Sequence, residues 1–151
     1  MKIKKNKAFT LIELLVVVAI IGILAAVGVT TFGGFQDKAK ASSSKAIHKG
    51  VQKKLAAELV KCSLGDSSIL NNLNCTGLTA AGVRDNIGSA GAVFTDKNPY
   101  NTSEWGVKVG TAANVAGQTS IGASGTNITI KTCTKTGCAT ADQLTDNVAV
   151  E

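Results

Sequence analysis

With 151 residues, the chain is the size of one ordinary domain, and its single proline and six aromatic residues argue against a large aromatic-rich binding surface. Its formal net charge of +6 would suit a nucleic-acid-binding protein, but four of those charges lie within the first eight residues, on Lys2, Lys4, Lys5 and Lys7. Loss of that segment would leave a net charge of +2, so charge alone indicates no nucleic-acid partner.

An apolar run follows the basic start and extends over about 21 residues, from Phe9 to Val29. A secretory signal peptide also combines basic residues with an apolar stretch, but its apolar part is shorter and is discarded. This run is long enough to span a bilayer as a helix. The lysines before it place the N-terminus in the cytoplasm by the positive-inside rule. We therefore expect a membrane-spanning helix whose C-terminal side is exported.

Glu13 is the one charged residue inside this apolar run. A carboxylate in a membrane helix costs about 2.5–3.5 kcal/mol on insertion scales, and it normally marks a function that supplies a partner. Glu13 lies one helical turn after Phe9. If the chain is cut between Ala8 and Phe9, the new α-amino group of Phe9 is a cation. The pair can then form within one chain or between neighbouring staggered subunits.

These residues carry a specific resemblance to a known family. The N-terminus of type IV pilins, and of the related type II secretion pseudopilins, is similar to the segment Ala8-Phe9-Thr10-Leu11-Ile12-Glu13-Leu14-Leu15. The resemblance implies that a prepilin peptidase removes residues 1–8 as a leader and methylates the amine of Phe9. It also implies that Phe9, Thr10 and Glu13 serve assembly, with Glu13 neutralising the amine of an adjacent subunit while residues 9–36 pack into a filament core.

The sequence departs from the family pattern at two positions. Ala8 occupies the position before the cut where the family has Gly, and Thr30 occupies a position where it often has Pro. Gly28, Gly33 and Gly34 can replace the effect of that proline, because each glycine costs roughly 1 kcal/mol in a helix interior. We expect the helix to bend, melt or stretch there.

Residues 37–62 are predicted to continue as an amphipathic helix. Its apolar residues recur at four-residue spacing, at Ile47, Val51, Leu55 and Leu59. A separate basic stripe on a different face consists of Lys45, Lys49 and Lys53. We interpret the basic stripe as a solvated face, with acidic patches of neighbouring subunits, nucleic acid or lipid headgroups as the alternatives. His48 is predicted to lie on the surface. Gly65 is the expected C-terminal cap.

Residues 63–151 are predicted to form a small globular head. Turn-forming residues up to about 103 indicate a loop with one short helix, and alternating residues then predict three strands, at Trp105–Val109, Gln118–Ile121 and Thr126–Thr132. Their apolar face, with Val107, Val109, Ile128 and Ile130, can pack on the apolar stripe of the amphipathic helix. The expected fold is α+β and pilin-like: a long N-terminal helix packed on a small antiparallel sheet.

Four cysteines lie in the exported part, at Cys62, Cys75, Cys133 and Cys138. An even number in an oxidising compartment favours disulfides. Zinc is the alternative, but the spacings lack the usual paired two-residue pattern. Three connectivities are possible, and proximity in the chain favours Cys62 with Cys75 and Cys133 with Cys138. The segment between the last two either contacts neighbours or ligands, as in many pilins, or only closes a short turn.

The expected function is that of a structural subunit rather than an enzyme. The head has no His, no nucleophile paired with a base and no phosphate-binding loop, and we expect no cofactor and no metal. The resemblance implies a type IV pilus subunit, made in the bacterial inner membrane and assembled into an extracellular homo-oligomeric filament for adhesion, motility or DNA uptake. The alternatives are a minor pilin, a secretion pseudopilin and a competence pilin that binds DNA through Arg84, Phe94, Tyr100 and Trp105.

Overall fold

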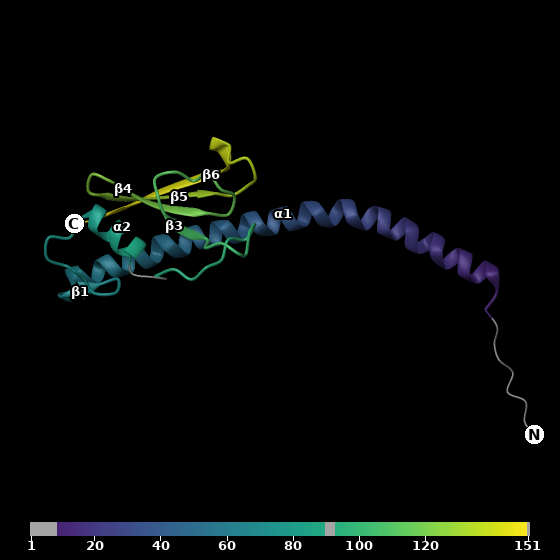
Figure 1. Ribbon diagram of the computed structural model, residues 1–151, viewed down its shortest axis with the longest axis horizontal. Helices are drawn as coiled ribbons and strands as arrows, with labels where there is room; N and C mark the ends of the chain where they lie inside the picture. Colours follow the sequence, from purple (N-terminus) through teal and green to yellow (C-terminus); the bar gives the residue numbers. More distant parts are fainter. Residues whose placement is uncertain (1–8, 90–92, 151) are drawn as a thin grey trace, which may run out of the picture. The chain divides into compact units, whose positions relative to one another are not determined.

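The structure is a computed structural model that describes residues 9–89 and 93–150 (Figure 1). The leader, residues 1–8, therefore lies outside the described residues, and so does Ala8. The chain divides into two compact units between Gln36 and Asp37. In chain order the elements are α1 (Leu11–Ser63), β1 (Ser68–Ile69), β2 (Leu73–Asn74), α2 (Ala80–Ser89), β3 (Val107–Val109), β4 (Thr119–Ser124), β5 (Asn127–Cys133), the 3-10 helix η1 (Thr140–Asp142) and β6 (Gln143–Ala149).

In the first unit, helix α1 exposes a nearly uninterrupted apolar surface. Its large side chains stay between about half and nine-tenths exposed, from Val17 at 46% to Leu11 at 88%. Gly28, Gly33 and Gly34, where the helix was expected to bend, melt or stretch, all lie within the uninterrupted helix α1. By length and composition, α1 is the one helix among the described residues that could cross a membrane. In lipid its backbone would need no outside partner, because every interior N–H and C=O is bonded within the helix.

In the second unit, the C-terminal part of α1 packs against a four-stranded sheet with the order β3-β4-β5-β6 (Figure 1). Val51 and Leu55 of α1 are 1% and 0% exposed. They meet the fully buried isoleucines of β4 and β5, which are Ile121, Ile128 and Ile130. Burying such a side chain contributes about 1.5–3 kcal/mol, so this contact is the main source of stability in the unit. The expected α+β fold with a long N-terminal helix is confirmed.

The sheet differs from the expected one in three respects. Strands β4, β5 and β6 pair antiparallel, but β3 pairs parallel to β4. Strand β6 was not predicted, because only Leu144 and Val148 give it an apolar face while Thr145 and Asn147 point to solvent. Val109 was expected in the core but is 39% exposed, and it packs beside the end of α2, where a Cβ on Gly88 would lie 3.2 Å from it.

His48 was predicted to lie on the surface, and this prediction is wrong: the residue is 2% exposed. Its Nδ1 lies 2.8 Å from Thr132 Oγ1 on β5, and its Nε2 lies 2.9 Å from Asp146 Oδ2 on β6. Thr132 Oγ1 lies a further 2.6 Å from Thr119 Oγ1 on β4. The four-residue apolar spacing was read too strictly, because at 3.6 residues per turn His48 lies above Val51 on the same helix face.

The end of α1 is closed by backbone and covalent contacts. Gly65 has a φ of 99°, which glycine adopts without steric cost, and its N–H donates to Cys62 O at 3.1 Å. Glu58 accepts from Lys61 Nζ at 2.6 Å and from Leu70 N–H at 3.2 Å. The Lys61 hydrogen bond, with help from Leu70 N–H, lowers the pKa of the Glu58 carboxyl below its usual range despite its partial burial. Glu58 thus ties the β1 turn to the helix.

Replacing His48 with alanine should lower the free energy of unfolding of the second unit by about 1–3 kcal/mol, the cost of removing one partner from a buried polar cluster. Trp105 is the only tryptophan, so its fluorescence reports this unit during urea unfolding of the full chain in detergent. The exposed neighbour Lys49 is the control, because Lys49→Ala should change stability by no more than about 0.5 kcal/mol. Equal stability of the two variants would contradict a structural role for His48.

Candidate assembly site at the start of helix α1

Thr10 and Glu13 form a reciprocal hydrogen-bonded pair at the first turn of α1. Thr10 N–H donates to Glu13 Oε2 at 2.9 Å, and Glu13 N–H donates to Thr10 Oγ1 at 3.3 Å. The Thr10 hydroxyl also donates to Glu13 Oε2, at 2.8 Å. Since α1 begins at Leu11, Thr10 is the N-cap residue and Glu13 the third helical residue. This arrangement is a capping box, which satisfies two backbone N–H groups that the helix cannot bond itself.

From the sequence, Glu13 was expected to need a positively charged partner, and Thr10 was not recognised as its hydrogen-bond partner. The signal was present, because Thr-x-x-Glu before an apolar run is the pattern of a capping box. The structure therefore gives the carboxylate polar partners within its own helix. Among the described residues it supplies no positive charge there, since none of residues 9–37 is basic.

The surface around Glu13 is apolar. A shallow depression there is lined by Phe9, Ile12, Val16 and Val17 together with Glu13. Phe9 is 80% exposed and Ile12 is 71% exposed. When another apolar surface covers these side chains, water leaves the contact. The Glu13 carboxylate then attracts a cation more strongly than it does in water. The first turn of α1 thus combines an apolar contact surface with a single charge.

The basic stripe on the second part of α1 is exposed as expected. Lys45, Lys49 and Lys53 are all exposed, and none of them forms an ion pair with a described residue. The lysines beside them have other contacts. Lys54 Nζ donates to Val93 O at 2.5 Å and lies 5.0 Å from the centre of the Phe94 ring. The solvated face remains our interpretation of the stripe.

Both disulfides join cysteines that are close in the chain. Cys62 is bonded to Cys75, and Cys133 is bonded to Cys138. These are the pairings that proximity favoured, and all four cysteines are used. The first bond holds the β1–β2 segment at the end of α1, and the second closes the turn between β5 and η1.

The turn closed by Cys133 and Cys138 is also tied to its surroundings by polar contacts. Lys135 Nζ lies 2.7 Å from Asp142 Oδ1, and this hydrogen bond, reinforced by the charge of Asp142, raises the pKa of Lys135. The Tyr100 hydroxyl donates to Thr134 O at 2.7 Å. Burial, followed by the negative charge of Asp37, raises the pKa of Tyr100. The turn is therefore an ordered part of the head.

One cluster contains the residue types of a catalytic triad but not its geometry, because the hydroxyl lies on Nδ1 of the histidine and the carboxylate on Nε2, the reverse of the catalytic arrangement. Asp146, His48 and Thr132 are linked in the order carboxylate, imidazole and hydroxyl. Thr132 is 0% exposed, so its hydroxyl is shielded from solvent in this structure. The described residues also contain no group of three His, Cys, Asp or Glu side chains that could hold a metal ion. The cluster holds the sheet on the helix.

Comparison with known proteins finds a family model that matches the N-terminal part of the chain and a relative that matches a short stretch of it. Residues 3–29 match the family model of the prokaryotic N-terminal methylation motif. A stretch of 41 residues is 56% identical to the type IV major pilin protein PilA of Myxococcus xanthus (strain DK1622) and covers 27% of this chain. The match covers 19% of that relative, so the chain spans about a fifth of its length. No solved structure gives a significant match to the chain.

The fold and the site together describe an apolar N-terminal helix with one carboxylate, continued into a small disulfide-containing α+β head. The N-terminal methylation motif over residues 3–29 and the 41-residue similarity to a major pilin make the chain similar to type IV pilins over a part of its length.

Replacing Thr10 with valine should loosen the first turn of α1, because the cap hydroxyl is worth about 0.5–2 kcal/mol. Thr10→Ser keeps the hydroxyl and is the matched control. Hydrogen exchange of the Glu13 and Leu14 amides, measured on the full chain in detergent micelles, should be several-fold faster in the valine variant and nearly unchanged in the serine variant. The same exchange in both variants would show that the capping box is not formed in a micelle.

Proposed function

We propose that this chain is the major subunit of a type IV pilus, cleaved between Ala8 and Phe9 and polymerised through helix α1. The observation that carries the proposal is Glu13, which stands one turn after Phe9 on an otherwise apolar and exposed helix. The methylation motif over residues 3–29 supports the processing step, and the similarity to a major pilin favours an abundant subunit.

The mechanism follows from the charge balance at the first turn. Before the cut, the nitrogen of Phe9 belongs to a peptide bond, and among the described residues the Glu13 carboxylate is hydrogen-bonded to Thr10. After the cut, every subunit carries an α-ammonium group at Phe9. A subunit joining the filament can then place Glu13 against the ammonium group of a neighbour, and this pair removes much of the roughly 2.5–3.5 kcal/mol cost of a carboxylate in an apolar medium.

Apolar contact alone would not select one arrangement of subunits. A helix that leaves lipid for a bundle of similar helices gains little from the hydrophobic effect, because lipid tails are as apolar as its new neighbours. Packing and polar contacts must then decide the stagger. The single charge pair between Glu13 and Phe9 can specify that stagger, which a uniform surface of Leu, Ile and Val cannot.

In this proposal the precursor resides in the bacterial inner membrane, and the assembled filament lies outside the cell. Its partners are further copies of the chain, a prepilin peptidase and the pilus assembly machinery. A minor pilin or a secretion pseudopilin would share every N-terminal feature, and abundance in isolated surface fibres separates them from a major pilin. Adhesion, motility and DNA uptake would be properties of the whole filament.

Replacing Glu13 with glutamine separates the charge from the capping box, because glutamine still accepts the Thr10 hydrogen bonds at the third helical position. We expect Glu13→Gln to insert into the membrane normally and to reduce fibre yield at least tenfold, with Glu13→Asp intermediate. Fibres sheared from cells that have no other source of the subunit give the yield. Wild-type amounts of fibre from Glu13→Gln would contradict the charge-pair mechanism. Glu104→Gln, on the head, is the control.

Mass spectrometry of fibre subunits should find a chain that starts at Phe9, with one added methyl group and both disulfides intact. Removal of the leader takes four lysines from the chain, so the mature subunit has a lower net positive charge than the precursor. A mature chain that begins after residue 26 would instead identify the apolar run as a discarded signal peptide. An Ala8→Gly variant is the control, since it restores the family residue and should process at least as fast.

A further inference from the structure

The two open edges of the four-stranded sheet carry different apolar features. Strand β6 forms one edge and strand β3 the other. Each edge strand leaves one row of backbone N–H and C=O groups without a strand partner, which is an interaction surface that monomeric proteins usually protect with lysine, proline or a bulge. Strand β6, with the sequence Gln-Leu-Thr-Asp-Asn-Val-Ala, has no lysine and no proline.

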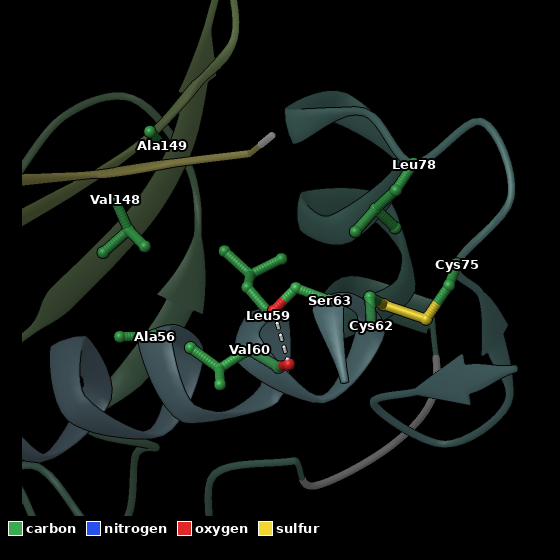
Figure 2. Close-up of a pocket in the computed structure, with 9 residues that line it drawn as sticks. All are labelled: Ala56, Leu59, Val60, Cys62, Ser63, Cys75, Leu78, Val148 and Ala149. Carbon is green, nitrogen blue, oxygen red and sulfur yellow. Dashed lines mark hydrogen bonds between the residues drawn. A yellow bond between two sulfur atoms is a disulfide. The ribbon is translucent and has the colours of Figure 1, made fainter. Parts of the chain in front are cut away.

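A groove of about 400 Å³ lies beside the β6 edge. It is lined by the last turns of α1, the Cys62–Cys75 disulfide, Leu78 and the end of β6. Figure 2 shows the side chains of Leu59 on α1, Leu78 in the loop before α2 and Val148 on β6 pointing toward one space. Val60, at the rim, is 53% exposed. The groove can take a large apolar side chain, and the open edge beside it can take backbone hydrogen bonds.

The β3 edge carries a large apolar side chain that projects from the surface. Trp105 stands just before β3 and is 46% exposed, and Val109 at the end of β3 is 39% exposed. Lys97 Nζ lies 3.7 Å from the centre of the Trp105 ring. The cation holds the indole in place and has no carboxylate partner among the described residues. Tryptophan is the residue most enriched at the centres of protein interfaces.

We propose that the Trp105 side of one head docks into the β6 groove of a second copy of this chain. The inference rests on the proposed filament function and specifies the contact between heads. The Trp105 side and the β6 groove lie on opposite edges of one sheet, so the contact joins two unlike surfaces. A copy that has bound one neighbour through one surface keeps the other surface free for the next copy. Such head-to-tail contacts produce open helical assemblies, whereas a contact between like surfaces stops at a dimer.

The charges of the two edges differ. Lys97 beside Trp105 has no carboxylate partner among the described residues, whereas Lys108 is paired with Glu104 at 2.9 Å. Strand β6 carries no basic residue, and its Asp146 carboxylate, 44% exposed, is hydrogen-bonded to His48. A second copy is favoured over a free apolar ligand, because every copy of this chain presents both the groove and an exposed indole accompanied by the Lys97 cation.

Cross-linking in fibres tests the contact, with the full chain assembled by cells. Val60→Cys and Ser103→Cys are combined in one chain that keeps Trp105, and sheared fibres are treated with a short bis-maleimide, with the native disulfides left intact; Ser103 is exposed and lies two residues before Trp105. The double variant should give a ladder of covalent multimers, whereas each single variant stays monomeric. Lys49→Cys combined with Ser103→Cys is the matched control and should also stay monomeric, because Lys49 is exposed and lies on α1 away from the groove.

Each outcome decides the proposal. Fibres whose double variant stays monomeric, or single variants that form dimers, would overturn it. If the double variant makes no fibres, Trp105→Ser and Val60→Ser replace it: fibre yield should fall at least fivefold in both while the circular dichroism of the full chain is unchanged, and wild-type yields would overturn the inference. If the unmodified chain makes no fibres in cells with pilus machinery, the proposed function itself fails.

Discussion

A charged or polar group that leaves water must find a partner, and this requirement explains two positions on helix α1. At the start of the helix, the Glu13 carboxylate stands among apolar side chains and accepts hydrogen bonds from the hydroxyl and the N–H of Thr10. In the second unit, the imidazole of His48 is buried and contacts Thr132 and Asp146. His48 has a partner at each ring nitrogen, whereas Glu13 has the dipoles of Thr10 but no counter-charge among the described residues.

Several constraints act together to stabilise the packing of the sheet on α1. Apolar side chains of one helix face and one sheet face supply most of the free energy, through Leu55, Ile128 and Ile130. A disulfide at each end of that contact reduces the entropy of the unfolded chain, by roughly 2–3 kcal/mol for loops of this size. The hydrogen bonds of His48 fix the position of β5 and β6 along the helix.

Much of this architecture could be predicted from local sequence patterns. The apolar run, the stop at Gly65, the short cysteine separations and the alternation around Ile128 and Ile130 depend on residues near one another in the chain. The features that were not predicted correctly depend on contacts between residues that are distant in the chain. His48 meets partners 84 and 98 positions away, and no local pattern reports them. The parallel pairing of β3 with β4, and the mostly polar strand β6, are likewise set by the rest of the sheet. At the assembly site, the Thr-x-x-Glu signal was local and was overlooked.

A filament built from this chain needs specificity more than it needs apolar area. The apolar part of α1 can slide against copies of itself at little cost, since Leu, Ile and Val side chains present nearly uniform surfaces and lipid offers the same environment. Discrete features remove that freedom. In the proposed filament, the single charge at Glu13 distinguishes one stagger from the next, and the proposed docking of the indole in the groove distinguishes one lateral contact from another. Because this proposed contact joins unlike surfaces, each added subunit would recreate the site for the next one, and growth would have no built-in end.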